Sequence, residues 1–240
     1  MLGVIPARLA SNRLPRKVLR TIAGRPKIWH VYQAARRAPH LADVLVATDA
    51  QEVVDACHAL GIPAVLTSPY HPSGTDRVWE VAQGRAADVY VNVQGDEPLV
   101  TAGHVERLVQ PFLEHADTQV TTLKIRATDA EVATPNVVKV VCDVTGRALY
   151  FSRHPIPFDR DRTGAPVYKH FGLYAYRAHA LDAFHRLPPS PLEVVERLEQ
   201  LRFLENGLPI TVVETSEPTI GVDTEADLRA VEALLAARRS

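Results

Sequence analysis

The stretch VYVNVQGDEP, residues 89–98, starts as a buried strand and ends in residues that a strand does not need. Valine recurs at every second position of its first half, a period typical of β-structure. The second half holds an amide, a glycine and two adjacent carboxylates, Asp96 and Glu97. Gly95 permits a turn or a close backbone approach, and Pro98 prevents the strand from continuing. Because ligands bind beyond the carboxyl ends of parallel strands, this tip predicts part of a binding site.

The residues before this strand alternate between short Val-rich runs and amphipathic helical stretches. Strands are expected at residues 2–6, 43–49, 63–67 and 88–96. Asp49 is predicted to cap a helix that ends at Gly61, and a second helix follows the quoted stretch. Their buried stripes are Val53, Val54, Cys57 and Leu60, and Val105, Leu108, Val109 and Phe112. This alternation predicts an α/β fold with a doubly wound, mostly parallel sheet.

The second half of the chain is richer in β-structure. Between residues 120 and 176 lie three β-like pieces, with a hairpin expected at 143–147. A helix is expected from its cap Ser190 to its stop at Gly207, then a strand at 208–215. Thr224 is expected to cap the last helix, with Asp227 completing the capping box. We expect a single domain over residues 1–240 that contains a β-rich sub-region at about 120–176.

Composition excludes several classes of protein. The 240 residues include 27 Lys and Arg and 28 Asp and Glu, so the net charge of −1 gives no electrostatic reason to expect nucleic acid or a membrane surface as partner. No window is apolar enough for a membrane span, and the N-terminus lacks a signal-type pattern, so we expect a cytoplasmic protein. Cys57 and Cys142 have no partner at metal-ligand spacing and are expected to be reduced core residues.

The loop after the first strand carries four cations, Arg8, Arg13, Arg16 and Lys17. Such a loop can simply be solvated, but this one follows the first strand of a parallel sheet, where phosphate-binding elements occur. It lacks both the dinucleotide-binding glycine pattern and the P-loop pattern. Any phosphate here would therefore be held by side-chain cations.

Asp96 follows a later strand of the same sheet. A carboxylate beside a phosphate-binding loop calls for a cation between them, and Mg²⁺ with oxygen ligands is the natural candidate. Asp223 in GVDTEADL is the second acid expected to converge on the metal, since Thr224 is available as helix cap. The alternatives are a plain Gly-Asp-Glu-Pro turn and an Asp223 that itself caps the helix.

Eight segments together resemble the 3-deoxy-manno-octulosonate (Kdo) cytidylyltransferases, in order and over essentially the whole chain. They are VIPARLASNRLPRK, HPSGTDR, VNVQGDEP, PNVVKVV, ALYFSRHPIPFDRDR, HFGLYAYR, SPLEVVERLEQLR and GVDTEADL. The resemblance implies a Rossmann-like nucleotidyltransferase fold whose β-rich sub-region serves dimerisation and sugar binding. It also implies a Mg²⁺-dependent reaction in which Kdo attacks the α-phosphate of CTP to give CMP-Kdo and pyrophosphate, for lipopolysaccharide-type glycan synthesis, in a homodimer.

The same resemblance assigns roles to individual residues. Asp96 and Asp223 fall on the metal-binding acids, with two Mg²⁺ ions expected when substrates are bound, and together with Arg8 and Lys17 they form the implied catalytic set. The implied nucleotide-binding residues are Ala7, Arg8, Arg13, Lys17, Ser73 and Arg77. The implied sugar-binding residues are Gln94, Arg153, His170, Tyr174, Glu199 and Gln200.

Four alternatives stay open. Ser73 can instead cap the helix that follows it, and His170 and Tyr174 can be ordinary residues of one strand face. The substrate can be sialic acid or an amino-Kdo analogue, and a catalytically inactive nucleotide-binding protein is the alternative of another class. Arg16 stands where the family more often has glycine, and Glu97 has no assigned role.

Overall fold

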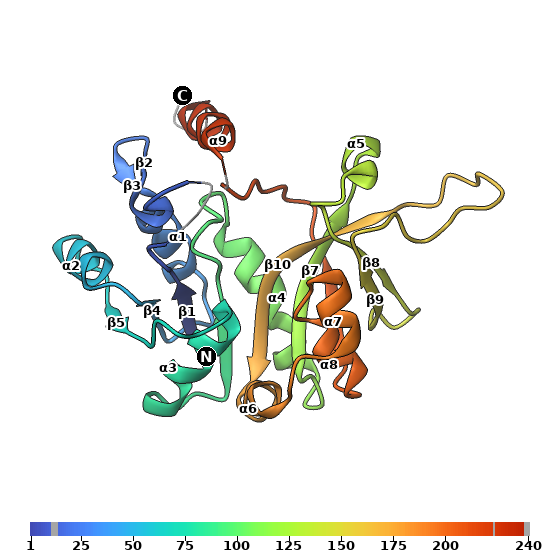
Figure 1. Cartoon of the computed structure of the whole chain (residues 1–240), viewed down its shortest axis with the longest axis horizontal. Coiled ribbons are helices and arrows are strands. Elements are labelled where there is room, and N and C mark those ends of the chain that lie inside the picture. The colour runs from blue at the N-terminus through green and yellow to red at the C-terminus, as the bar shows by residue number, and fades with distance from the viewer. Residues whose placement is uncertain (11–13, 223, 238–240) are drawn as a thin grey trace. The chain divides into compact units, whose positions relative to one another are not determined.

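The computed structural model describes residues 1–10, 14–222 and 224–237, with side chains described up to residue 234. The chain forms two compact units (Figure 1). The first comprises Met1–Glu106 together with Thr219–Ser240, and the second comprises Arg107–Pro218. The predicted β-rich sub-region at about 120–176 lies inside the second unit.

The first unit is built on a parallel sheet with the order β6-β1-β4-β5. Its strands are β1 (Leu2–Pro6), β4 (Asp43–Thr48), β5 (Ala64–Leu66) and β6 (Val89–Asn92). β1 pairs in parallel with β4 on one side, where Leu2 faces Asp43, and with β6 on the other, where Leu2 faces Tyr90. The prediction of parallel strands is confirmed. The chain order reverses between β1 and β6, and such a switch point is where open α/β sheets bind ligands.

Helices connect and flank these strands. They are α1 (Lys27–Arg36), α2 (Gln51–Ala59), α3 (Gly74–Gly84) and α9 (Glu225–Ala237), with the short 3-10 helix η1 (Lys17–Leu19) and the small hairpin of β2 (Thr21–Ile22) and β3 (Arg25–Pro26) between β1 and α1. Gly61 stops α2 at a φ of 68°, as predicted. The prediction that Asp49 caps α2 is wrong, because Ala50 occupies the N-cap position and no side chain caps this helix.

A small apolar cluster joins five segments of the first unit, among them β2 and the residues just before α9. The loop before η1, the turn after β6 and α9 all contribute side chains to it. The capping box that begins α9 forms as predicted, since Thr224 and Asp227 bond each other's backbone N–H groups. The members of the cluster are Leu14, Ile22, Leu99, Val222, Leu228 and Val231.

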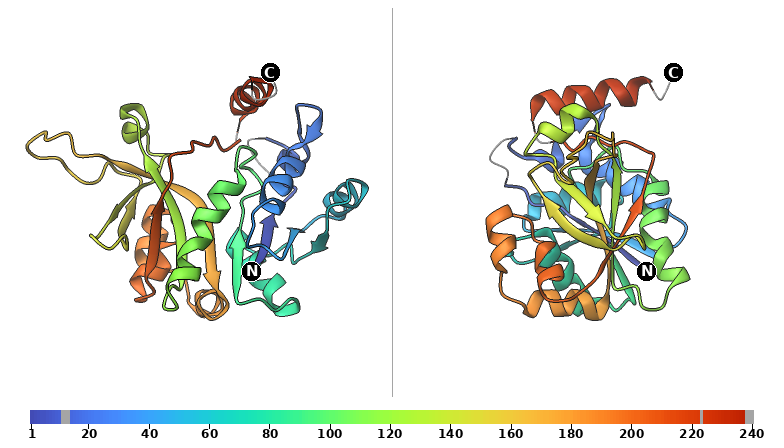
Figure 2. Two further views of the ribbon diagram at one scale, coloured as in Figure 1. Left: turned by 180° about the vertical axis from the view of Figure 1, so that it is seen from behind. Right: turned by 90° about the vertical axis from the view of Figure 1, so that its right-hand side faces the viewer.

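The helix α4 (Ala102–Glu114) leads into the second unit and buries the predicted stripe, although it contains Pro111. In this unit β7 (Val120–Arg126) pairs in parallel with β11 (Ile210–Glu214) and antiparallel with β10 (Tyr168–Arg177). The expected hairpin forms from β8 (Lys139–Cys142) and β9 (Ala148–Ser152). Figure 2 shows these strands from two further sides. The short helices α5 (Asp129–Ala133) and α6 (Ala178–Arg186) complete this part.

The helix predicted from Ser190 to Gly207 is interrupted. It divides into α7 (Pro191–Glu196) and α8 (Leu201–Glu205), because Arg197 adopts a left-handed conformation with a φ of 54° and ends the first segment. The capping box of Ser190 and Glu193 and the stop at Gly207 are confirmed. The apolar pattern runs through the break, so periodicity alone does not reveal it.

Both cysteines are free. Cys57 is buried, and burial raises the pKa of its thiol to about 11, so this side chain behaves as a core residue. Cys142 is partly buried. Within the described part of the chain, no helix has the length and apolar character needed to cross a membrane.

Candidate active site

A cavity of about 440 Å³ lies in the first unit, beyond the carboxyl ends of β1 and β6. The loop after β1, η1, the start of α3 and the turn after β6 all contribute to it. Parallel strands put their carboxyl ends at one edge, so residues far apart in sequence meet there. The lining residues are Pro6, Arg8, Ala10, Lys17, Val18, His71, Pro72, Ser73, Gly74, Arg77, Gln94, Gly95 and Asp96.

Lys17 and Asp96 form an ion pair across this cavity. Lys17 Nζ donates to Asp96 Oδ2 at 2.6 Å, and the two side chains are 13% and 38% exposed. Arg16, which precedes Lys17, adopts a left-handed φ of 55°, a conformation that favours glycine. The predicted phosphate cation and the predicted metal ligand are thus direct neighbours.

Gly95 brings two strand ends together. A Cβ at this position would lie 2.7 Å from the main-chain oxygen of Pro6, closer than a real side chain tolerates. The residue therefore permits the close backbone approach predicted from the sequence. It also sets the separation between the loop after β1 and the turn that carries Asp96.

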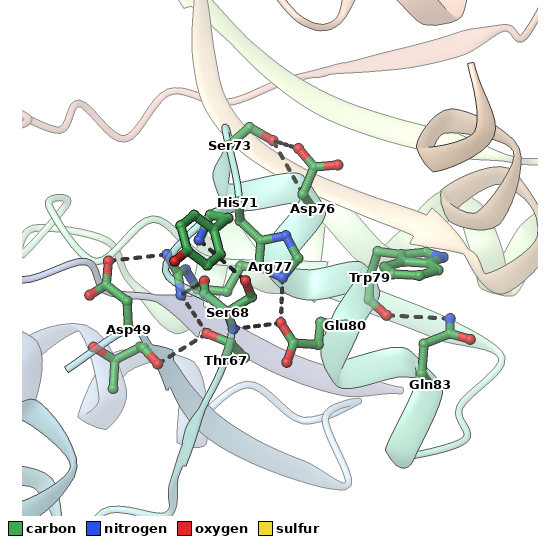
Figure 3. A network of polar contacts seen from close by, with 12 residues as sticks. Asp49, Thr67, Ser68, His71, Ser73, Asp76, Arg77, Trp79, Glu80 and Gln83 are labelled. Atoms are coloured by element: carbon green, nitrogen blue, oxygen red, sulfur yellow. Dashed lines mark hydrogen bonds and ion pairs between the residues drawn. The ribbon is translucent and has the colours of Figure 1, made fainter. Parts of the chain in front are cut away.

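Arg77 is buried on α3 and is held by a network of polar contacts (Figure 3). Its guanidinium donates to the Thr67 hydroxyl, to the Ser68 carbonyl at 3.3 Å and to Asp49 Oδ2 at 3.4 Å. Burial lowers the pKa of Arg77, and the positive charge of Arg8 acts in the same direction. Two cations that repel each other at one cavity favour an anionic ligand.

The aspartate that was expected to cap α2 belongs to this network instead. Asp49 Oδ1 accepts a hydrogen bond from the Leu9 N–H at 3.2 Å, while Oδ2 accepts from Arg77. Its carboxylate therefore links the loop after β1 to α3. Its place at the tip of β4 is the signal that could have identified it, since residues at strand tips face the ligand edge of the sheet.

The sequence reasoning missed the cavity residue His71 and its partner Glu80 (Figure 3). His71 lines the cavity and pairs with Glu80, which also accepts from the Ser68 N–H at 2.8 Å. Burial acts to raise the pKa of Glu80, but these hydrogen bonds and the neighbouring positive charges outweigh it, so the pKa is lowered. The available signals were that His71 opens the HPSGTDR segment and that Glu80 lies one helical turn after Arg77.

The other predicted residues of this unit divide into two groups. Arg8, Ser73 and Gln94 line the cavity; Ser73 also caps α3, since its hydroxyl accepts from the Asp76 N–H at 3.2 Å. Ala7 is buried and its N–H is bonded to Ala47, so it continues the strand ladder. Arg13 and Asp223 lie outside the described residues.

The turn after β6 meets the chain that leads to Asp223. The Val222 N–H donates to the main-chain oxygen of Asp96 at 2.9 Å. Burial, followed by the charge of Asp96, raises the pKa of Glu97 to about 7. No group of three metal-binding side chains occurs among residues 1–10, 14–222 and 224–237. A carboxylate at an anion pocket, with a second acid following Val222 in sequence, fits Mg²⁺, which takes one or two protein carboxylates plus substrate phosphates.

In the second unit, β10 gathers aromatic side chains. The His170 and Tyr174 rings lie 5.4 Å apart, and the Thr122 hydroxyl lies 3.0 Å from His170 Nε2. The register shifts between Phe171 and Tyr174, so the strand has a bulge there. Burial lowers the pKa of His170 to about 3. A neutral imidazole beside two hydroxyl groups suits the recognition of a polyhydroxylated ligand.

The region after α7 lies near these aromatic residues. Burial raises the pKa of Tyr174 well above its ordinary value, and the negative charge of Glu199 contributes in the same direction. Gln200 is buried, and its Nε2 has no hydrogen-bond acceptor among the described residues. The break between α7 and α8 thus places both residues in a turn, where their side chains are not confined to a helix surface.

Arg153 is fixed by main-chain oxygens. Its guanidinium donates to the carbonyls of Glu196 at 2.8 Å, Pro135 at 3.2 Å and Arg197 at 3.4 Å. The Glu196 carboxylate accepts from the Arg153 N–H at 2.9 Å and from the Ser152 hydroxyl at 2.6 Å. Neutral carbonyls orient the guanidinium without neutralising it, so its charge can still attract a carboxylate.

A parallel sheet with a switch point, a cation-lined cavity and a strand-tip acid define an α/β nucleotidyltransferase. The family model described as Cytidylyltransferase matches residues 2–214. The chain therefore belongs to the cytidylyltransferase family and, within it, to the 3-deoxy-manno-octulosonate cytidylyltransferases, as the following relatives show.

The relative of that name from Acidobacterium capsulatum is 58% identical over 240 residues, covering 100% of this chain and 98% of the relative. The one from Koribacter versatilis is 59% identical over 238 residues, covering 99% and 90%. A solved structure of CMP:2-keto-3-deoxy-manno-octonic acid synthetase complexed with CTP matches with a TM-score of 0.96 and 44% identity, covering 99% and 98%. A thymidylyltransferase structure from Bacillus anthracis, at a TM-score of 0.70 and 17% identity over 98% and 95%, shares the fold.

Proposed function

We propose that the protein transfers CMP from CTP to Kdo and releases pyrophosphate. The observation that carries this proposal is the cavity at the switch point, which unites Arg8, Lys17 and Arg77 with the strand-tip acid Asp96. The names of the relatives support CTP and Kdo as substrates.

The anomeric hydroxyl oxygen of Kdo attacks the α-phosphorus of CTP, and the bond from that phosphorus to the bridging oxygen of the pyrophosphate breaks. The hydroxyl proton passes to solvent water, and the displaced bridging oxygen keeps the electron pair of the broken bond as part of the pyrophosphate. Arg8 and Lys17 stabilise the charge that develops on the leaving group. Transfer is direct, because this displacement needs no protein nucleophile.

Magnesium is part of this proposal. Asp96 and Asp223 would hold it, and two ions are expected with both substrates present. Bound Mg²⁺ neutralises phosphate charge and lowers the pKa of the attacking hydroxyl. Lys17 donates to Asp96 at 2.6 Å, and this ion pair orients the acid toward the cavity.

The sugar-binding residues are proposed from the chemistry of their side chains. Arg153 attracts the Kdo carboxylate, while His170 and Tyr174 bond its hydroxyl groups. Gln94, Glu199 and Gln200 are the further polar residues assigned to the sugar, and the Gln200 amide nitrogen offers a buried donor.

The assembly and location are proposed as a homodimer in the cytoplasm. Apolar side chains exposed in the second unit, Val144, Leu149, Val194 and Val195, support contact with a second copy. Use of CTP, an intracellular nucleotide, supports the cytoplasm.

A coupled assay for pyrophosphate release with CTP and Mg²⁺ tests the activity. Kdo is expected to give turnover, and sialic acid and amino-Kdo are the competing substrates. If only sialic acid or only amino-Kdo gives turnover, that sugar and not Kdo is the substrate. CTP binding without Mg²⁺-dependent pyrophosphate release from any of the three supports an inactive nucleotide-binding protein.

The metal assignment is tested by Asp96→Asn. This variant is expected to keep its fold, because the backbone bond to Val222 is retained, and to lose turnover at least about 1,000-fold since a metal ligand is lost. Asp88→Asn, an exposed acid just before β6, is the matched control and is expected to turn over normally. Near-normal activity of Asp96→Asn would contradict the metal argument.

A further inference from the structure

Glu97 makes a long-range contact that the proposed chemistry does not use. Its Oε2 accepts a hydrogen bond from the Thr219 hydroxyl at 2.9 Å, although 122 positions separate the two residues. Its own N–H bonds the Gln94 carbonyl at 3.1 Å, and its carbonyl accepts from the Val100 N–H at 3.1 Å. Glu97 is therefore held by hydrogen bonds of both its backbone and its side chain.

The residues after Thr219 lie along the same turn. A Cβ at Gly221 would come within 3.0 Å of Glu97 Oε1, so the absence of a side chain there leaves room for the carboxylate. The next residue, Val222, donates its N–H to the main-chain oxygen of Asp96 at 2.9 Å. Two hydrogen bonds thus join the 219–222 segment to the turn. One involves the side chain of Glu97 and the other the backbone of the adjacent Asp96.

This junction bears on the two acids assigned to the metal. Asp96 is the residue whose carbonyl accepts the backbone bond, and Asp223 directly follows Val222 in sequence. The apolar cluster anchors Val222. Gly221 has no side chain, so the backbone there has more conformational freedom than at other residues. The bond at Thr219 restrains the segment before Gly221, and the bond at Val222 restrains it after Gly221.

We propose that Glu97 is a positioning residue that holds the 219–222 segment against the turn after β6 and so orients the turn that carries Asp96, the acid proposed to bind the metal. This inference rests on the proposed function, since it deepens the same site. Glu97 acts through position, by accepting one hydrogen bond. An amide oxygen at this position can accept the same bond, whereas a methyl group cannot.

Four variants separate this role from a general loss of structure. Thr219→Val removes the hydroxyl at nearly constant volume and leaves Glu97 in place, while Thr219→Ser restores the donor. Glu97→Ala removes the acceptor, and Glu97→Gln keeps an acceptor without the charge. Thr118→Val is the matched control, because the Thr118 hydroxyl donates a comparable buried bond to the Pro111 carbonyl in the second unit.

The first measurement is the affinity for Mn²⁺ in the presence of CTP, monitored by electron paramagnetic resonance. The second is steady-state kinetics with Kdo, which shows whether a variant changes the KM for Mg²⁺ or kcat. Thr219→Val and Glu97→Ala are expected to weaken Mn²⁺ binding about tenfold, the lower end of the effect of removing a partner that orients a metal ligand. Their combination is expected to be no worse than either alone, since both remove the same bond. Thr219→Ser and Glu97→Gln are expected to bind Mn²⁺ within about twofold to threefold of the wild type.

Wild-type Mn²⁺ affinity in Thr219→Val would overturn the proposal, as would fully additive effects in the double variant or an equal loss in Thr118→Val. Absence of turnover by the wild type with CTP and Kdo would instead reject the proposed function. The Mn²⁺ comparison does not require turnover, so the two failures are distinguishable.

Discussion

His170 makes the stability of the protein depend on pH in a calculable way. Its ring lies against Phe151 and Tyr174, at 5.1 and 5.4 Å between ring centres, and beside the Thr122 hydroxyl. Burial lowers its pKa from 6.5 to about 3 in the folded protein. Between pH 6.5 and about pH 3, His170 is therefore protonated in the unfolded chain but neutral in the folded protein. The contribution of His170 to the free energy of unfolding is fully present above pH 6.5 and is lost as the pH decreases toward 3.

The magnitude follows from the size of the interval. Each pH unit between the two pKa values is worth about 1.4 kcal/mol for one proton. At pH 5, about 1.5 units below the unfolded value, His170 is expected to reduce the free energy of unfolding by about 2 kcal/mol relative to pH 8. Such a loss is a large fraction of the stability of an ordinary domain.

The perturbation is His170→Asn, which keeps a polar partner for Thr122 but does not titrate. Urea unfolding followed by far-ultraviolet circular dichroism at pH 8 and pH 5 gives the free energies. The wild type is expected to lose about 2 kcal/mol more than the variant over this interval. His40→Asn, at an exposed position, is the control and is expected to follow the wild type. If wild type and His170→Asn lose stability in parallel within about 0.5 kcal/mol, the reasoning from burial is refuted.

Three further predictions concern packing and charge. Gly95→Ala is expected to lower the free energy of unfolding by about 2 kcal/mol in urea titrations, because its Cβ would clash with Pro6. Arg77→Lys is expected to weaken CTP binding about tenfold by calorimetry, since lysine cannot reproduce the guanidinium geometry; unchanged affinity would contradict its role. Lys139→Met is expected to lose about 3 kcal/mol by the same urea titration, because the buried Lys139 ammonium bonds three carbonyls; an unchanged unfolding midpoint would contradict this.

Much of the lining of the cavity in the first unit could be predicted from sequence. Arg8, Lys17, Gln94 and Asp96 follow strands whose alternation is clear, and parallel pairing requires their tips to share an edge. Asp49 shows the limit of this reasoning. An aspartate before a helical stretch is a good cap by local rules, but its bonds to Leu9 and Arg77 depend on segments that only the tertiary fold brings near.

The sugar side depended more on tertiary contacts. The break at Arg197 interrupts a helix whose apolar pattern continues, and it places Glu199 and Gln200 in a turn. The resemblance implied only that Arg153 binds the sugar, and the structure adds that three carbonyls orient its guanidinium. Neither feature has a local sequence signal, because both depend on where the second unit brings β9 and α7 together.

The sequence by itself determined the α/β class, the order of strands and helices and the identity of the cations and acids at strand tips. These follow from periodicity and chain order, which are properties of neighbouring residues. The tertiary structure decided which of these side chains meet. The pairing of Lys17 with Asp96 and of Glu97 with Thr219 requires contacts over long separations. Such contacts depend on packing of the whole unit, so Glu97, unassigned from sequence, gains a proposed role only when its distant partner is seen.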